Sequence, residues 1–161
     1  MTTTLQDHKG ALLAAATAFA DACTSEAIRR TAGIELQPGE RYAGVLLNED
    51  GTPSHHVVLL PGDAEDVTWQ AALDWAKQAG GELPNRREQS LLFANGELPN
   101  RREQSLLFAN AKSAFEAAWY WSGEAHEDGS YAWGQDFNGG GQGYDHKSYE
   151  GRARAVRRVT T

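Results

Sequence analysis

Residues 67–88 read VTWQAALDWAKQAGGELPNRRE, and this stretch carries the strongest structural signals of the chain. Apolar residues recur every three or four positions after Thr68, which predicts a helix from Thr68 to about Ala79 with one buried face. The predicted buried face consists of Trp69, Ala72, Leu73 and Ala76, and the predicted solvent face of Gln70, Asp74, Lys77 and Gln78. Gly80 and Gly81 then end the helix.

The second half of this stretch belongs to an internal repeat. Residues 81–95 read GELPNRREQSLLFAN, and residues 96–110 repeat the same letters. Repeat proteins drift in sequence and usually need three or more units, so two perfect copies favour a recent tandem duplication, natural or introduced in the laboratory. Each copy has the pattern Asn-x-x-Glu, which resembles a capping box at a helix start. Only one copy can fill the ancestral position, so we expect the other to form an extra, looped-out or end-to-end helix on the surface.

Strand patterns flank the two predicted helices. Residues 41–47 and 55–60 are short apolar runs joined by the turn residues 48–51 (NEDG), which predicts a β-hairpin. The neighbours His55 and His56 would point to opposite faces of a strand and could not share a metal ion.

Beyond Phe115 the chain becomes aromatic and rich in strand signals. Tryptophans spaced by two fall on one strand face and usually fill a core, which we predict for Trp119, Trp121 and Trp133. We expect a flexible glycine-rich loop at 139–143 and a closing strand at 152–159. The arginines of that last segment are expected to pair with carboxylates such as Glu82, Glu97 or Asp74. The acidic side chains Glu124, Glu127 and Asp128 are expected to lie solvated in a polar turn.

The composition and the N-terminus restrict the class of protein. The net charge of −7 disfavours general nucleic-acid binding. The longest apolar run, residues 11–20, is too short to cross a membrane, and we recognise no signal peptide. The single cysteine, Cys23, cannot form an internal disulfide and is expected to be buried as a small hydrophobe. We divide the chain into a helix at 1–33 that serves docking or oligomerisation and a main domain at 34–161.

Several of these motifs, in this order, resemble a phage and bacterial family long described only as a domain of unknown function. That family is related to the C-terminal domain of a Legionella collagen-like adhesin. The matching segments are VTWQAA at 67–72, Trp75-Ala76, GGELPNRRE at 80–88, WYWS at 119–122, YAW at 131–133 and RARAVRRV at 152–159. The resemblance covers roughly residues 40–159 and leaves the N-terminal helix outside, and the duplication departs from the family pattern.

The resemblance implies an α+β, C-type-lectin-like domain with short mixed and antiparallel sheets and two helices, one of them tandemly duplicated, preceded by an N-terminal helix. The fold is similar to that of formylglycine-generating enzymes and of phage tropism determinants diversified by retroelements. In those determinants an aromatic, glycine-rich stretch near the C-terminus carries the ligand contacts, which here corresponds to residues 131–149. Rings and polar groups alternate in this stretch, as is typical of recognition surfaces. The predicted ligand-binding residues are Tyr131, Gln135, Asn138, Gln142, Tyr144, His146 and Tyr149.

The sequence gives little support to catalysis or to a metal site. Formylglycine-type catalysis depends on active-site cysteines, and Cys23 lies outside the resembling region. Calcium-binding lectins use Glu-Pro-Asn or Gln-Pro-Asp, which residues 82–85 (ELPN) and 37–39 (QPG) do not match. No paired Cys/His spacing for zinc is present. We therefore expect no catalytic residues, no metal ion and no cofactor.

Two hypotheses for function follow. In the first, the chain is a non-enzymatic, phage-type binding protein that recognises a bacterial surface glycan or protein. In the second, it is a structural virion component, such as a capsid decoration or tail accessory protein, which assembles through its N-terminal helix as a homo-oligomer or with other virion proteins. Both place the protein in the virion after synthesis in the host cytoplasm, and we expect neither binding to nucleic acid nor insertion into a membrane.

Overall fold

A computed structural model describes residues 27–93 and 112–161, and the chain divides into two units, Met1–Glu35 and Leu36–Thr161. The rest of the predicted N-terminal helix, Cys23 and the second copy of the duplicated segment lie outside the described residues. Within the described ranges no helix is long and apolar enough to cross a membrane.

The described part of the first unit is the end of a helix. Residues 27–31 are helical, and the N–H of Gly33 donates to the Arg30 carbonyl at 3.0 Å. Gly33 has a φ of 65°, the left-handed conformation that glycine adopts after a helix.

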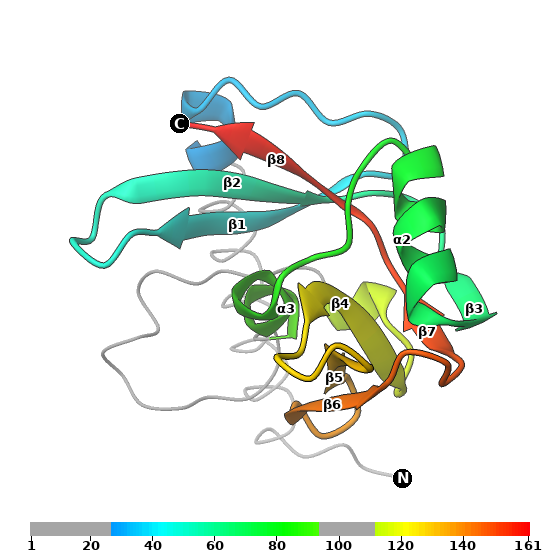
Figure 1. Cartoon of the computed structure of the whole chain (residues 1–161). Helices are drawn as coiled ribbons and strands as arrows, with labels where there is room; N and C mark the ends of the chain where they lie inside the picture. Colours follow the sequence, from blue (N-terminus) through cyan, green and yellow to red (C-terminus); the bar gives the residue numbers. More distant parts are fainter. Residues whose placement is uncertain (1–26, 94–111) are drawn as a thin grey trace, which may run out of the picture. The chain divides into compact units, whose positions relative to one another are not determined.

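The second unit is an α+β structure, as predicted (Figure 1). Its described residues form two sheets, with strand order β1-β2-β8 in one and β3-β7-β4-β5-β6 in the other. Neighbouring strands are antiparallel except β4 and β7, which pair in parallel at Tyr120 and Arg152. The elements are β1 (Arg41–Leu47), β2 (Pro53–Leu59), β3 (Ala64–Val67), α2 (Trp69–Gln78), α3 (Arg86–Phe93), η1 (Lys112–Ala114), β4 (Trp119–Ala125), β5 (Tyr131–Asp136), β6 (Gln142–His146), β7 (Gly151–Ala153) and β8 (Val156–Thr160).

The predicted hairpin is present as β1 and β2, with Arg41 opposite Leu59. The predicted closing strand is wrong as a single element, because the chain leaves the five-stranded sheet after β7 and enters the three-stranded sheet as β8. The break falls between Ala153 and Val156, where the Leu60 N–H donates to the Ala155 carbonyl at 2.9 Å. This crossing segment connects the two sheets.

Helix α2 follows the sequence prediction closely. It begins after Thr68, although the Thr68 side chain makes no capping hydrogen bond. Ala72 and Ala76 are fully buried, and Trp69 and Leu73 on the same face are half-buried. The predicted polar face is exposed along its whole length.

Two hydrophobic cores meet at β4, whose neighbouring rings Tyr120 and Trp121 are both buried. Tyr120 packs into the core formed by β1, β2, β8 and α3, together with Leu91, Leu92 and Phe137. Trp121 packs into the core beneath α2, and its Nε1–H donates to the Val67 carbonyl at 3.0 Å. Because successive strand residues point to opposite faces, one dipeptide anchors both cores.

Candidate functional site

The β5–β6 hairpin carries a cluster of rings on one face, which we call the aromatic face: His126, Tyr131, Trp133, Tyr144 and His146. Strand register creates it, since Tyr131 lies directly opposite His146 and Trp133 directly opposite Tyr144. Residues opposite each other in an antiparallel pair share a face, and residues spaced by two share it as well. His126 is the residue that directly follows β4.

The rings contact one another in a continuous arrangement. The ring of Tyr144 is central, with centroid distances of 5.3 Å to Trp133, 5.7 Å to Tyr131 and 4.3 Å to His126. His146 extends the cluster, 5.6 Å from Tyr131. Most of these pairs are edge-to-face or tilted, which is the arrangement that ring quadrupoles favour.

The aromatic face is open to solvent. Tyr144 is 53% exposed and His146 is exposed, while the other three rings are half-buried. The prediction that Trp133 belongs to the core is therefore wrong: it shares its strand face with Tyr131, as expected, but it is only half-buried, and no apolar layer of the described residues covers that face completely. Trp121 is fully buried, as predicted, and Trp119 is half-buried.

Helix α3 borders the aromatic face through its first residue, Arg86. Its guanidinium carbon lies 3.7 Å from the ring centroid of Trp133, a cation–π contact. The Arg86 Nε–H donates to Gln142 Oε1 at 3.2 Å, and the Arg86 backbone N–H donates to Glu124 Oε1 at 2.8 Å. Glu124 is thus half-buried and engaged at the helix start, so the prediction of a solvated side chain is wrong for this residue.

Two glutamines lie where the aromatic face passes beneath α3. Gln142 contacts the Arg86 carbonyl at 2.7 Å, Ser90 Oγ at 3.1 Å and Gln135 Oε1 at 3.2 Å through its Nε2. Gln135, directly opposite, is only 1% exposed. Of these two predicted site residues, Gln142 is therefore at the edge of the aromatic face, whereas Gln135 is enclosed.

The remaining predicted site residues lie elsewhere. Asn138 is exposed in the β5–β6 turn, where its N–H donates to Asp136 Oδ1 at 2.9 Å. Tyr149 is 47% exposed, but its ring lies edge-on to Trp121, whose side chain occupies the opposite face of the sheet. Gly143 belongs to β6 rather than to a flexible loop. The structure therefore brings together Tyr131, Gln142, Tyr144 and His146, and separates Asn138 and Tyr149 from them.

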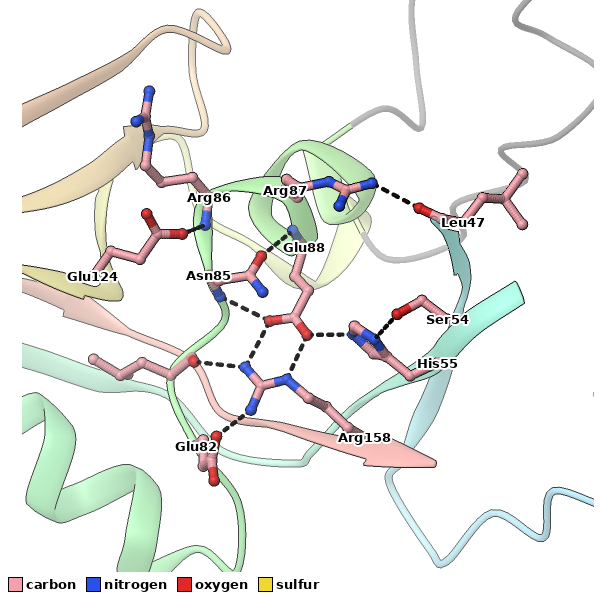
Figure 2. Close-up of polar contacts among 11 residues, drawn as sticks. Leu47, Ser54, His55, Glu82, Asn85, Arg86, Arg87, Glu88, Glu124 and Arg158 are labelled. Atoms are coloured by element: carbon pink, nitrogen blue, oxygen red, sulfur yellow. Dashed lines mark hydrogen bonds and ion pairs between the residues drawn. The ribbon is translucent and has the colours of Figure 1, made fainter. Parts of the chain in front are cut away.

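A second cluster, the Glu88 network, surrounds the fully buried carboxylate of Glu88 (Figure 2). The Glu88 N–H donates to Asn85 Oδ1 at 2.8 Å, and the Asn85 N–H donates to Glu88 Oε2 at 2.7 Å, which confirms the predicted capping box. Arg158 from β8 binds both carboxylate oxygens, at 2.6 and 2.8 Å, and also pairs with Glu82. His55 Nε2 donates to Oε1 at 2.8 Å.

The titration of Glu88 reflects these contacts. Burial alone raises the pKa of this carboxyl, but the hydrogen bonds from Arg158, from the Asn85 N–H and from His55 outweigh it and leave the pKa lowered. The carboxylate accepts hydrogen bonds from three residues, so it is occupied as a structural anion.

The two neighbouring histidines of β2 have separate environments, as predicted. His56 is buried on the other face, where its Nδ1 lies 2.7 Å from the hydroxyl of Tyr42. Burial raises the pKa of Tyr42 to about 12 and, together with the charge of His55, lowers the pKa of His56. The pair is therefore neutral near pH 7, with the tyrosine hydroxyl as donor.

The arginines of the last segment mostly pair with carboxylates. Arg152 binds Asp63 and Glu65, and Arg157 binds Glu40 at 2.7 Å. The predicted pairing of Arg158 with Glu82 is present. Arg154 instead donates to the carbonyls of Ala114 and Leu60. Glu97 lies outside the described residues.

The sequence indicated part of the aromatic face but omitted Arg86, His126 and Trp133 from the predicted site. The spacing of Tyr131 and Trp133, read together with that of Tyr144 and His146, was the signal available for one shared hairpin face. Across residues 27–93 and 112–161, no group of three or more His, Cys, Asp or Glu side chains is arranged to hold a metal ion. Comparisons of the chain with protein-family models and with curated proteins find no match.

Proposed function

We propose that this chain is a non-enzymatic recognition domain that binds a bacterial surface ligand through the aromatic face. The observation that carries the proposal is the exposed ring cluster itself. Isolated surface rings are common, but here five contacting rings, two of them exposed and three half-buried, form a contiguous patch of the kind that marks binding sites. Tyrosine and tryptophan provide large contact areas with little loss of side-chain entropy.

A glycan is the ligand class that this surface favours among bacterial surface molecules. Sugar rings have one face of C–H groups, which packs on an aromatic ring, and hydroxyls at their edges, which require hydrogen-bonding partners. Tyr131, Tyr144 and His146 offer both a ring and a polar group. The bacterial surface as the source of the ligand, and the virion as the location of the protein, derive from the family resemblance.

The strand arrangement supports the proposed C-type-lectin-like fold. The last strand of the unit, β8, returns to pair antiparallel with β2, next to β1. The two helices and the five-stranded sheet are inserted between these strands in sequence, and the β5–β6 hairpin is at the sheet edge (Figure 1). The first and last strands of the unit thus belong to one sheet, and the β5–β6 hairpin lies at the edge of the other.

The buried carboxylate of Glu88 is not available as a general acid or base. Glu88, whose side chain is fully buried, is engaged by Asn85, His55 and Arg158. A general acid or base needs a free position from which to exchange a proton with a substrate. Glu88 has none.

The test measures binding of labelled protein to a panel of bacterial cells and envelope polysaccharides, with Tyr144→Ala and Tyr149→Ala compared. Both tyrosines are about half exposed, but only Tyr144 belongs to the aromatic face. We expect saturable binding that Tyr144→Ala weakens about thirtyfold, the effect of a typical hot-spot residue, and that Tyr149→Ala leaves unchanged. Equal losses in the two variants, or no binding across the panel, would contradict the proposal.

A further inference from the structure

The polar groups available on the aromatic face are mostly hydrogen-bond donors. Two of them come from histidines whose ring orientation is fixed by local contacts. The Asp128 N–H donates to Nδ1 of His126 at 3.1 Å, and the Ser148 N–H donates to Nδ1 of His146 at 3.3 Å, with the Ser148 hydroxyl 2.7 Å from the same atom. A ring nitrogen that accepts a backbone N–H carries no proton, so the neutral ring has its proton on Nε2.

Both histidines thus present an Nε2–H, and neither Nε2 has a partner in the part of the chain that the structure describes. Each imidazole therefore adds a donor to the edge of the ring cluster.

The third donor group is the guanidinium of Arg86. Its carbon lies 3.7 Å from the ring centroid of Trp133, and its Nε–H donates to Gln142. Its two terminal amino groups make no hydrogen bond or ion pair with other described residues, and Figure 2 shows the guanidinium directed away from the Glu124 carboxylate. Glu124 instead accepts the Arg86 backbone N–H. Arg86 therefore retains an ordered, planar pair of donors at the border of the ring cluster.

We infer that the ligand is an acidic glycan, whose anionic oxygens are bound by Arg86 and by the Nε2–H groups of His126 and His146 while its sugar rings pack on Trp133 and Tyr144. A guanidinium fork matches the two oxygens of a carboxylate or a phosphate, and a charge-assisted hydrogen bond is about twice as strong as a neutral one. This inference rests on the proposed function and specifies its ligand class.

The net charge of the chain acts against this ligand at long range but not at contact. A charge of −7 repels an anionic polymer, but screening at about 0.15 M salt reduces that repulsion beyond about 8 Å. Direct contacts with Arg86 are screened much less. Specificity for acidic sugars would therefore persist at physiological salt, where the measurements are made.

The experiment compares acidic polymers with their neutral counterparts. Polygalacturonate is compared with the same polymer after carboxyl reduction, and phosphorylated mannan with mannan freed of phosphate. We expect at least one acidic polymer to bind at least tenfold more tightly than its counterpart, and the preferred polymer identifies the anion as carboxylate or phosphate. If neither acidic polymer binds better than its neutral form, the inference is overturned, whether or not the proteins bind cells.

Substitutions of Arg86 test whether this residue causes the preference for acidic polymers. Arg86→Gln should remove the preference for the acidic polymer, and Arg86→Lys should restore only part of it because an ammonium group has no fork. The matched control is Arg101→Gln, which makes the same change in the same fifteen-residue context in the second copy of the duplicated segment. Loss of preference in Arg101→Gln to the same extent would overturn the assignment to Arg86. Binding of neutral and acidic polymers with equal affinity, lost in Tyr144→Ala, would refute this inference and leave the proposed function intact.

Discussion

The Glu88 network and the aromatic face both involve the first turn of α3. The network buries a charged side chain, whereas the aromatic face leaves rings exposed or half-buried. Arg86 and Glu88 are two positions apart, so they project from roughly opposite sides of the helix. On one side a carboxylate is completely buried among partners from β2 and β8. On the other side a guanidinium and five rings form a surface that is open to solvent. The Glu88 carboxylate can be buried because Asn85, His55 and Arg158 bind it. The rings stay partly exposed because the described elements do not cover them completely.

This contrast indicates which cluster serves the fold and which is left for a ligand. In the Glu88 network, hydrogen bonds from Asn85, His55 and Arg158 all end within the chain. In the aromatic face, the apolar surface and the donors remain only partly used. Changes in the first cluster should therefore affect stability, and changes in the second should affect binding.

The largest effect is expected from Glu88→Gln. The substitution keeps the shape of the side chain but leaves Arg158 without its main counter-charge. Breaking a buried ion pair by removing one partner costs about 3–5 kcal/mol. We expect a loss near the lower end, about 3 kcal/mol, because Arg158 keeps some solvent contact and its pairing with Glu82. Urea denaturation measures the change in the free energy of unfolding.

The duplication supplies the control for this prediction. Glu103→Gln makes the same change in the second copy, and since residues 86–93 of the first copy form α3, it should leave stability unchanged. If both single variants are as stable as the parent but the double variant is not, each copy can replace the other in the α3 position. That result would contradict a fixed role for the first copy.

The two clusters also differ in how far sequence alone predicts them. The capping box, the helix after Thr68 and the β1–β2 hairpin depend on residues a few positions apart, and all were predicted. The partners of Glu88 were not, because Arg158 reaches it from a strand 70 positions later. Local signals define an element, whereas its neighbours depend on how the elements pack.

The prediction of the aromatic face was limited in the same way, because local signals do not show how elements pack. That Tyr131 and Trp133 share one strand face follows from their spacing. Whether that face is covered depends on how α3 packs against the β5–β6 hairpin, and no local pattern encodes this packing. The sequence therefore placed Trp133 in the core and Gln135 at the surface, while the packing of α3 against the hairpin does the reverse.

A smaller loss of stability is expected when the pH is lowered. The pKa of Glu88 is lower in the folded protein than its ordinary value of about 4.3 in the unfolded chain, so the unfolded state binds more protons in this range. The stabilisation by Glu88 is complete above that ordinary pKa and is lost as the pH falls through the lowered value, by about 1.4 kcal/mol per unit of difference.

The variant Glu88→Gln tests whether Glu88 causes this pH dependence. In urea titrations between about pH 3 and 6, Glu88→Gln should show a shallower loss of stability than the parent. Some dependence should remain, because the hydrogen bond from Arg157 also lowers the pKa of Glu40. Identical slopes in the parent and the variant would show that the Glu88 carboxylate does not stabilise the folded state as an anion.

The smallest effect on stability is expected from Tyr144→Ala, the substitution that should weaken ligand binding most clearly. The ring loses its cross-strand contact with Trp133 and its contacts with Tyr131 and His126, but about half of its surface already faces water. Cross-strand aromatic pairs contribute roughly 0.2–1 kcal/mol, so the free energy of unfolding should fall by less than about 1 kcal/mol. A loss above about 2 kcal/mol would mean that the aromatic face is an extension of the core. A small loss, combined with strongly weakened binding, would mean that the rings are retained for contact with a ligand, because the fold gains little from them.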